Sequence, residues 1–470
     1  CTLSTRKTRP TGGGATPTTT PVNSFTNGIN TFVIQSGHTI TINQNLDVYQ
    51  ITVENGGSLV VGNSTTARTV TVEEDVVVNS TGSVTVGAFN ASHTLNIYGN
   101  IVANGTFDLY NSTTQVANIN FYNNSIQTIT GTPTLFELNS ITLGGLTELT
   151  PSFGMTIKGN VIFGNNTIFN SGTYTHYIGG NWVGNSLSTH TSNGTIVFNG
   201  VNPVISGTTS FNNLQVSSGS LTTIGSAAST ITINGNVLIT GNSTLTIGSQ
   251  SAVKTINVTG DFQIDAGSTC NVGMFNTVHL ISLSGNLIVN GTFDMYKAAG
   301  QVANVIFTGN ANASISGSGA TCRFNSITIN KGTDASSILD VSRIISIIPP
   351  TSNASYLNIN NGTFKLSSAS VLSPYYGAVS GGATTICAAT GRLWINNAAA
   401  SVSCVNAGTS TVSGYPIVTG ILQVTSGTFE YGSGNDRISL TSSTSSLIVD
   451  GANAVVKLYG GINNNGSGSI

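Results

Sequence analysis

The carboxylates are the side chains best suited to acid–base or metal chemistry, and they are sparse in this sequence. Glu73, Glu74 and Asp75 form the densest group, whereas Asp261 and Asp265 are more widely spaced. On a β-strand, Glu73 and Asp75 would share one face, where two carboxylates could bind a cation or act as an acid pair. The alternative is a charged, outward-facing corner that discourages edge-to-edge strand pairing, and this is the interpretation we adopt.

A second acidic pair, Asp334 and Asp340, is flanked by two cations, Lys331 and Arg343. This mixture of charges could in principle serve a polysaccharide lyase. A solvated charged corner requires no ligand at all. We therefore expect the four side chains to face solvent.

Neither the histidines nor the cysteines have the spacing of a metal site or a catalytic triad. The histidines are scattered along the chain: His38, His93, His176, His190 and His279. The cysteines include no CxxC pair: Cys1, Cys270, Cys322, Cys387 and Cys404. We expect no metal and no cofactor.

Two tryptophans would be natural platforms for sugar rings if they were exposed. Trp182 follows a Gly-Asn corner at which other segments carry Ile, Val or Leu, so we expect Trp182 in the core. Pro374-Tyr-Tyr-Gly377 interrupts the strand pattern and is either a protruding loop, where function tends to lie, or a plain solvent-facing turn.

Cys387 and Cys404 are separated by a stretch close to one expected turn of a repeat. Stacked on neighbouring coils, they could form a disulfide in an oxidising compartment. Two buried free thiols that act as small apolar side chains would fit the sequence equally well.

The composition limits the classes of protein to which this chain can belong. Only 6% of the 470 residues are charged, the net charge is −2, and 39% are hydrophobic. A chain without a basic patch is a poor partner for nucleic acid, and no apolar run is long enough for a transmembrane helix. Abundant Ser, Thr, Asn and 56 Gly with short Val/Ile/Leu runs indicate a folded, all-β protein.

Strand-sized segments with period-two alternation begin at about residue 24 and are separated by turn signals. Thr39–Ile42, Thr69–Val72 and Leu95–Tyr98 are examples. Asn-Gly recurs between such segments, and its glycine would supply the positive φ of a tight corner.

An internal duplication organises the chain. Residues from about 51 to 144 match those from about 237 to 330 at a constant offset. Asp108 and Asp294 occupy equivalent positions in Asn-Gly-Thr-Phe-Asp, as do His93 and His279. Because the aspartate recurs, we expect it to have a role in a turn rather than in catalysis.

Repeats of roughly 20 to 25 residues with two or three short strands bury their apolar face only when they stack. We therefore expect an elongated β-solenoid, a parallel and right-handed β-helix, over residues 23–470, with about 19 coils. Outward Asn side chains at equivalent corners would form hydrogen-bonded ladders. A string of Ig-like sandwiches is the competing architecture, but its strands are longer and its turns less frequent.

Thr195-Ile-Val-Phe-Asn-Gly200, with Ile205-Ser-Gly207 and Phe211–Val216, resembles the β-helical repeats of large secreted and cell-surface proteins of Bacteroidetes. The similarity covers most of residues 50 to 460. It implies an adhesin-like or filament protein on the bacterial outer surface. The C-terminal sorting domain familiar in such exported proteins is not recognisable in this sequence.

Residues 1–22, rich in Thr, Pro and Gly, are expected to form a linker. A Cys at position 1 followed by such a linker looks like a mature bacterial lipoprotein, in which Cys1 is acylated. In the other interpretation, the numbering merely starts at a processed end, or Cys1 pairs elsewhere.

These observations favour a non-catalytic, structural or adhesive rod on the cell surface. Its expected partners are other surface proteins or glycans, and the membrane through the lipid of Cys1. A polysaccharide lyase or glycoside hydrolase on the same scaffold is the alternative. An ice-binding solenoid is a third hypothesis, but its Thr-x-Thr pairs, at Thr39, Thr69, Thr230 and Thr244, are irregularly spaced.

Overall fold

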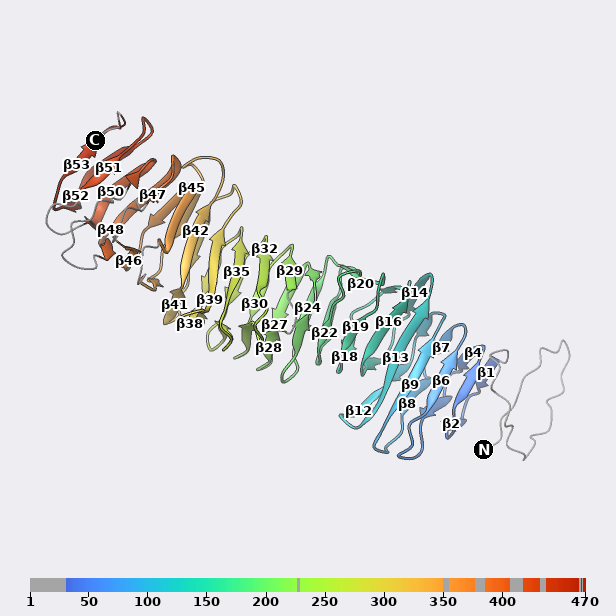
Figure 1. Cartoon of the computed structure of the whole chain (residues 1–470). Helices are drawn as coiled ribbons and strands as arrows, with labels where there is room; N and C mark the ends of the chain where they lie inside the picture. Colours follow the sequence, from blue (N-terminus) through green and yellow to red (C-terminus); the bar gives the residue numbers. More distant parts are fainter. Residues whose placement is uncertain are drawn as a thin grey trace, which may run out of the picture. The chain divides into compact units, whose positions relative to one another are not determined.

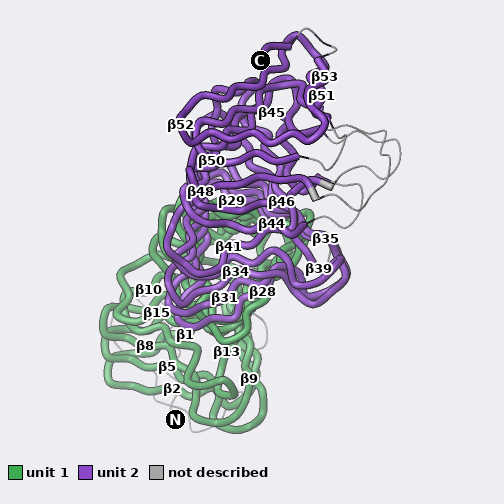
Figure 2. The backbone as a smooth tube through the Cα atoms, turned by 90° about the vertical axis from the view of Figure 1, so that its left-hand side faces the viewer, with its two compact units in different colours: residues 1–213 green, residues 214–470 purple. Residues whose placement is uncertain are grey.

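The computed structural model describes residues 31–225, 229–349, 355–376, 385–405, 417–431, 437–464, 466 and 468–470. The described residues contain no helix, and their parallel strands stack as a β-solenoid of about 16 turns (Figure 1). The prediction of a β-solenoid is thus confirmed. The chain forms two compact units, residues 1–213 and 214–470, which are described separately (Figure 2).

The number of turns is smaller than predicted because many coils are longer than expected. Hydrogen-bonded partners on neighbouring coils are 20 residues apart at Ser210 and His190, and 31 apart at Asn361 and Asn330. Corners, hairpins and, in the last coils, longer strands account for the difference.

In the strands, apolar and polar residues alternate, so that successive side chains point into the core and out to the surface. In Ser58–Val61, Leu59 and Val61 are buried while Ser58 and Val60 face outward, and most short strands repeat this pattern. Inward Val, Ile, Leu and Phe from successive coils pack on one another along each unit. Since each coil alone cannot enclose its apolar side chains, stacking supplies the core.

Each coil of unit 1 contributes one strand to each of three faces. The first face contains β1 (Thr31–Ile34), β4 (Gln50–Val53), β7 (Val76–Val78), β10 (Ile101–Ala103), β14 (Ile126–Thr130), β17 (Glu148–Pro151), β20 (Ile168–Asn170) and β23 (Thr189–Thr191). The second face contains β2 (Thr39–Ile42), β5 (Ser58–Val61), β8 (Ser83–Val86), β11 (Thr106–Asp108), β15 (Leu135–Leu138), β18 (Thr156–Ile157), β21 (Thr175–Ile178) and β24 (Thr195–Phe198). The third face contains β3 (Leu46–Val48), β6 (Thr69–Val72), β9 (Ala91–Ile97), β13 (Gln115–Asn123), β16 (Ile141–Gly145), β19 (Val161–Phe163), β22 (Trp182–Val183) and β25 (Val204–Ser206), and β26 (Thr209–Phe211) follows it in the chain.

Unit 2 repeats the three-strand coil and then changes to longer strands. Its first set is β27 (Asn213–Val216), β30 (Val237–Ile239), β33 (Phe262–Ile264), β36 (Leu287–Val289), β40 (Ala313–Ser316) and β43 (Ile338–Val341). Its second set is β28 (Leu221–Ile224), β31 (Thr244–Ile247), β34 (Thr269–Val272), β37 (Thr292–Asp294), β41 (Thr321–Phe324) and β44 (Ser346–Ile347). Its third set is β29 (Ser229–Ile233), β32 (Lys254–Val258), β35 (Thr277–Leu283), β39 (Gln301–Phe307) and β42 (Ser326–Asn330). The last coils contain β45 (Leu357–Leu366), β46 (Val371–Tyr376), β48 (Thr390–Val405), β50 (Ile421–Tyr431) and β52 (Ser446–Leu458), with the smaller sheet β47 (Thr385–Cys387), β49 (Ile417–Val418), β51 (Ile438–Leu440) and β53 (Ile462–Asn464).

The two sequence copies have the same local structure. In each copy, the strand that ends in Asp is followed by an antiparallel hairpin, formed by β12 (Tyr110–Ser112) with β13 and by β38 (Tyr296–Ala298) with β39. These hairpins differ from the parallel pairing of the coils around them. The duplicated sequence therefore encodes a duplicated insertion, placed immediately after the aspartate.

The expected amide ladders are present on the outer surface. Asn139 Nδ2 donates to Asn118 Oδ1 at 2.6 Å, and the equivalent Asn325 donates to Asn304 at 2.7 Å in the second copy. Asn120 donates to Asn96 at 2.9 Å in the same manner. Each bond joins neighbouring coils, so polar side chains on the surface help to hold the stack together.

The glycines of Asn-Gly do not all act as predicted. Gly56 and Gly362 have positive φ, as a tight corner requires, but Gly105 and Gly291 do not. A Cβ on Gly105 would lie 2.2 Å from the carbonyl oxygen of Gly82 on the preceding coil. These glycines thus allow close approach of stacked backbones rather than an unusual φ.

Candidate functional site

The acidic group at residues 73–75 lies at a corner between β6 and β7, not on a strand. The alternative in which Glu73 and Asp75 share a strand face therefore does not hold, and the adopted interpretation of a charged corner agrees with the structure. Asp75 Oδ1 accepts bonds from the backbone N (2.7 Å) and the side chain (3.0 Å) of Asn100 on the next coil. Asn100 Oδ1 in turn accepts from Thr128 N and Oγ1 at 2.8 and 2.9 Å.

The second copy repeats this chain of hydrogen bonds. Asp261 Oδ1 accepts from Asn286 N and Nδ2 at 2.8 and 2.9 Å, and Asn286 Oδ1 accepts from Ser314 N and Oγ at 2.9 and 3.0 Å. Both aspartates thus fasten one coil to the next. Asp265 accepts a side-chain bond from Gln263 at 2.7 Å on its own strand end.

Asp108 and Asp294 start the two hairpins. Asp108 Oδ1 accepts from Tyr110 N at 3.0 Å, and Asp294 Oδ1 accepts from Tyr296 N at 3.2 Å. The predicted role in a turn is confirmed for both aspartates. Each aspartate also belongs to a cluster with a cation and a tyrosine ring, and these two clusters are the strongest candidate functional site.

In unit 2, Arg323 pairs with the aspartate through two nearly parallel bonds, Nε to Asp294 Oδ1 at 2.7 Å and the terminal nitrogen to Oδ2 at 2.5 Å. The same terminal nitrogen donates to Tyr296 O at 2.7 Å, and the guanidinium lies 5.7 Å from the Tyr296 ring centroid. The bond to Asp294 is the main cause of the raised pKa of Arg323.

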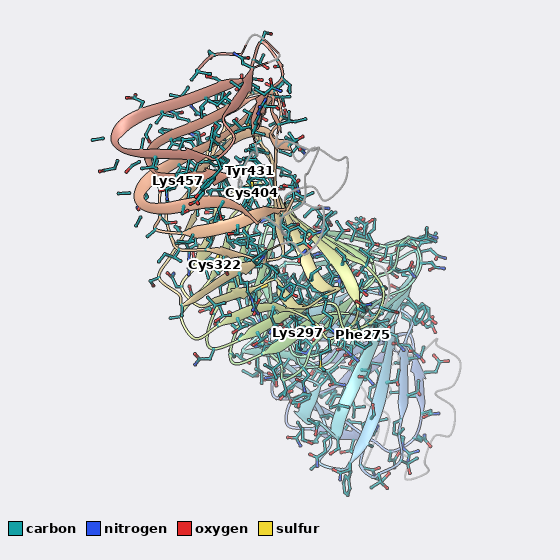
Figure 3. All side chains as sticks on the ribbon, turned by 60° about the vertical axis from the view of Figure 1, so that its left-hand side comes forward. Phe275, Lys297, Cys322, Cys404, Tyr431 and Lys457 are labelled. Atoms are coloured by element: carbon teal, nitrogen blue, oxygen red, sulfur yellow. The ribbon has the colours of Figure 1, made fainter. Side chains whose placement is uncertain are left out.

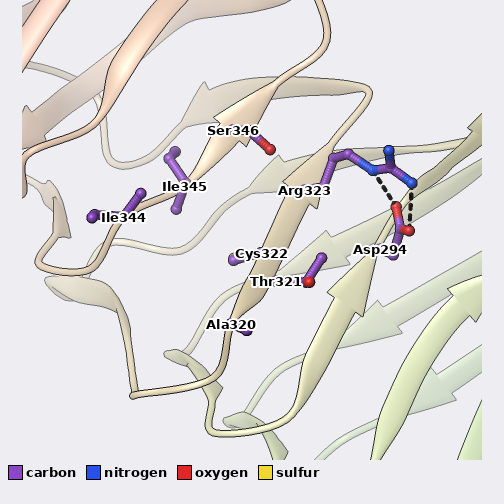
Figure 4. Close-up of a pocket in the computed structure, with 8 residues that line it drawn as sticks. All are labelled: Asp294, Ala320, Thr321, Cys322, Arg323, Ile344, Ile345 and Ser346. Atoms are coloured by element: carbon purple, nitrogen blue, oxygen red, sulfur yellow. Dashed lines mark hydrogen bonds and ion pairs between the residues drawn. The ribbon is translucent and has the colours of Figure 1, made fainter.

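A pocket of about 460 Å³ opens beside this ion pair (Figure 4). Asp294, Arg323 and Ser346 occupy matched positions on β37, β41 and β44, and Thr321 and Ile344 also line the pocket. The Thr321 and Ser346 hydroxyls can form hydrogen bonds with a ligand in this pocket, and Ile344 can contact a small apolar group. Because Asp294 already neutralises Arg323, the pocket lacks the free charge that binds an anion strongly.

In unit 1, the corresponding cluster holds two carboxylates. Asp108 and Glu137 are matched on β11 and β15, so their α-carbons are separated by about one strand spacing, 4.8 Å. Lys158 Nζ pairs with Glu137 at 2.9 Å and lies 5.9 Å from the ring centroid of Tyr110. Burial raises the pKa of Asp108; the backbone N–H of Tyr110 opposes this effect, the charge of Glu137 adds to it, and the charge of Lys158 opposes it.

Sequence analysis missed Glu137, Lys158 and Arg323 as members of these clusters. They come from the following coils, 29 or more residues from the aspartate, where no local spacing points to it. The two tyrosines could have been predicted as members, because the motif Asp-x-Tyr recurs at Asp108-Leu-Tyr110 and Asp294-Met-Tyr296.

Lys331 and Arg343 are buried, so the predicted solvated corner is wrong for both cations. Lys331 Nζ donates to Thr308 O at 2.7 Å, and the Arg343 guanidinium donates to the carbonyls of Val289 and Gly319. These carbonyl groups of neighbouring coils give the two buried cations hydrogen-bond partners inside the protein.

The two acids of that group remain near the surface. Asp334 is exposed and accepts a bond from Ser336 N at 2.8 Å. Asp340 is partly buried, and its nearest cation is Lys365 at 3.8 Å. The structure therefore does not bring the four charges together as a lyase site.

Four of the five histidines are buried, and His38 is exposed. His93 and His279 accept equivalent bonds from the backbone nitrogens of Arg68 (3.0 Å) and Lys254 (3.1 Å). His176 and His190 belong instead to an aromatic cluster in the core of unit 1. None of the four buried rings faces solvent as a general base would.

Trp182 is fully buried, which confirms its predicted place in the core. Its Nε1 donates to Thr209 Oγ1 at 3.1 Å. Trp394 is partly exposed on β48, and Lys365 Nζ and the Arg392 guanidinium lie 4.7 and 5.0 Å from its ring centroid. Because both cations lie against the Trp394 ring, they compete with a sugar for its surface.

Pro374 and Tyr375 lie within β46 and are buried, so neither a protruding loop nor a solvent-facing turn is correct for this segment. Tyr375 OH donates to Ile386 O at 3.3 Å. Burial and the two neighbouring thiols, Cys387 and Cys404, raise the pKa of Tyr375. Gly377 is outside the described residues.

Of the two alternatives for Cys387 and Cys404, the structure has the free thiols rather than the disulfide; Cys404 is labelled in Figure 3. Cys387 is matched with Val418 on the small sheet, whereas Cys404 is matched with Tyr375 on β46. Matched positions on neighbouring coils are 29 residues apart here, as at Asn361 and Thr390, so 17 residues do not complete a turn. The premise of the disulfide, that the two residues stack, is therefore incorrect.

Cys1 and the linker at residues 1–22 lie outside the described residues, and the lipid anchor stays a prediction. Within the part of the chain that the structure describes, no three His, Cys, Asp or Glu side chains are placed to hold a metal ion. No helix among these residues is long and apolar enough to cross a membrane.

Comparisons with known proteins identify no relative of this chain. No family model, no curated protein and no solved structure matches it. The resemblance to Bacteroidetes surface repeats therefore stays an expectation from the sequence.

Proposed function

We propose that the chain is a structural or adhesive protein of the bacterial cell surface, in which stacked coils form a stiff, non-catalytic scaffold. The observation that carries this proposal is the use of polar side chains. The duplicated chains from Asp75 through Asn100 and from Asp261 through Asn286 join three successive coils. Side chains committed to inter-coil bonds in the folded state reinforce the stack and leave few groups to act on a substrate.

The test uses the native cell. Deleting the coding sequence should reduce attachment of the cells to surfaces or to one another, and the full chain supplied in trans should restore it. Antibody labelling of intact cells should place the protein outside. Unchanged attachment, or labelling only after the cells are broken, would refute the proposal.

A polysaccharide-active enzyme is the second candidate, and one observation favours it. Asp108 and Glu137 are carboxylates on adjacent coils, and burial raises the pKa of Asp108. An acid whose pKa is raised beside a second carboxylate is the arrangement of a glycosidase, in which one group donates a proton and the other acts as nucleophile or base.

Release of new reducing ends from soluble polysaccharides would identify such an enzyme. Asp108→Asn and Glu137→Gln should each abolish the release. Asp294→Asn in the second copy, where Arg323 replaces the second acid, is the matched control and should leave the release unchanged. Release that persists in both acid variants would refute this candidate.

A further inference from the structure

Three exposed tyrosines occupy the same position on different coils of unit 1. Each tyrosine directly follows the last inward-facing residue of a strand on the third face. Tyr49 follows β3, Tyr98 follows β9, and Tyr122 lies near the end of β13. The strand pairings match Val48 with Val72, Val72 with Ile97, and Ile97 with Phe121. The residues that follow form one outward row, Tyr49, Glu73, Tyr98 and Tyr122, which we name the tyrosine column.

The rings of the column are open to solvent. The exposed fractions are 43% for Tyr49, 37% for Tyr98 and 39% for Tyr122. Soluble proteins scatter exposed aromatic residues singly, so a row of three on one face requires an explanation. Neighbouring coils are about 4.8 Å apart, which sets the spacing of Tyr98 and Tyr122 along the row.

A glycine on the next coil accommodates the last ring. Tyr122 is matched with Gly144, and a Cβ at Gly144 would lie 2.2 Å from Cε1 of the Tyr122 ring. The ring therefore lies over the backbone of the following coil. A larger residue at 144 would displace the ring from that position.

The fold does not need Tyr98 and Tyr122, as the second copy demonstrates. The positions equivalent to Tyr98 and Tyr122 are Ser284 and Thr308, which follow or end the same strands at the same register. Ser284 Oγ and Thr308 Oγ1 lie 2.9 Å apart in a hydrogen bond. A surface row that is aromatic in one copy and polar in the other, on one backbone, indicates a role in binding.

Polar groups border the column. On the adjacent outward row, Asn120 donates to Asn96 at 2.9 Å and Asn96 donates to Thr71 at 3.4 Å. Glu73 lies in the column itself, and burial together with the charge of Asp47 raises its pKa. Flat apolar rings beside amides and carboxylates match a sugar, whose C–H faces pack on aromatic rings while its hydroxyls form hydrogen bonds.

We infer that the tyrosine column binds a neutral polysaccharide chain lying along the stack. The inference rests on the proposed function and names the ligand of the adhesive surface. The column is one residue wide and bordered by polar rows, so it fits a narrow, linear chain better than a protein partner, which needs about 800 Å² of its surface covered. The acids at Asp47 and Glu73 repel polyuronates, since like charges oppose binding.

The test is affinity electrophoresis of the full chain in gels that contain a soluble β-glucan, a galactomannan or polygalacturonate. At least one neutral polysaccharide should retard the protein, and polygalacturonate should not. Tyr98→Ser combined with Tyr122→Thr, which installs the residues of the second copy, should weaken retardation at least tenfold. Gly144→Asn should weaken it as well by displacing the Tyr122 ring.

Tyr177→Ser is the control, because Tyr177 is similarly exposed on the second face of the same unit. It should leave retardation unchanged, and equal circular dichroism spectra should show that every variant folds. The inference is overturned if neither neutral polysaccharide retards the parent chain, if polygalacturonate retards it as strongly, or if the double variant is retarded as much as the parent.

Attachment of cells separates this inference from the proposed function. If deletion of the chain abolishes attachment but the double variant restores it fully, the column is refuted and the adhesive function stands. If the column binds glycan but deletion leaves attachment unchanged, the adhesive function fails instead. A third outcome would also refute the inference. If attachment is lost in the double variant but attachment of cells with the parent chain survives periodate oxidation of surface glycans, the partner is a protein.

Discussion

Lowering the pH from 7 to 4 should destabilise unit 1 through His190, whose ring is buried among aromatic side chains. The His190 ring centroid lies 4.9 Å from that of Trp182 and 5.5 Å from that of Phe169. Its nitrogens contact Ser171 Oγ at 2.9 Å and Ser210 O at 2.7 Å. In the neutral ring, Nδ1–H donates to the carbonyl and Nε2 accepts from the hydroxyl, so both nitrogens are satisfied without charge.

Burial lowers the pKa of His190 from 6.5 to about 4. The unfolded chain therefore takes up a proton at higher pH than the folded chain, and stability falls as the pH decreases through this interval. At about 1.36 kcal/mol for each pH unit, the interval corresponds to a loss of at most about 3.4 kcal/mol. The full contribution is present above pH 6.5, and most of the loss occurs by pH 4.

Urea unfolding at pH 7.5, 6, 5 and 4, followed by the fluorescence of Trp182 in a Trp394→Phe background, measures this loss. His190→Gln, which cannot titrate but can still donate and accept, is the control. Between pH 7.5 and 4, the free energy of unfolding of this variant should fall by about 2 to 3 kcal/mol less than that of the parent. Burial also lowers the pKa of His176, which should account for part of the loss that remains.

The reasoning is wrong if the variant and the parent lose equal stability over this range. It is also wrong if the imidazole resonances of His190 titrate near pH 6.5, since that would place the ring in contact with water.

Two further predictions concern packing. Trp182→Ala should lower the free energy of unfolding by about 3 to 5 kcal/mol, because it empties a fully buried site, whereas Trp394→Ala on the surface should cost about 1 kcal/mol; equal shifts in urea midpoint would contradict this. Gly248→Ala should cost more than Gly37→Ala in thermal unfolding, although both have positive φ, because only at Gly248 would the new Cβ meet a side chain, His279 Nε2 at 2.2 Å. A cost at Gly37 equal to or above that at Gly248 would show that backbone strain alone decides.

Much of the fold could be predicted from local patterns. Alternation with period two identifies the strands and their inward side chains, and repetition of those strands requires stacking to enclose a core. The buried Trp182 followed from its place after a Gly-Asn corner, and the role of Asp108 and Asp294 in turns followed from their recurrence. The errors at Lys331 and Arg343 concern residues just beyond strand ends, where alternation stops, and the error at Tyr375 concerns a strand whose pairing register shifts.

The sequence by itself determined that this chain is a stacked β-solenoid with a duplicated segment. Alternation and repetition can be recognised in the sequence even when the number of residues in each coil is unknown. Only the tertiary structure decided which side chains meet across coils, such as Lys158 with Glu137 and the members of the tyrosine column. Contacts between coils depend on how many residues each corner takes up, and that number varies from coil to coil. A one-residue slip in the pairing of a strand would exchange its inward and outward faces, so surface sites are defined only once the register is known.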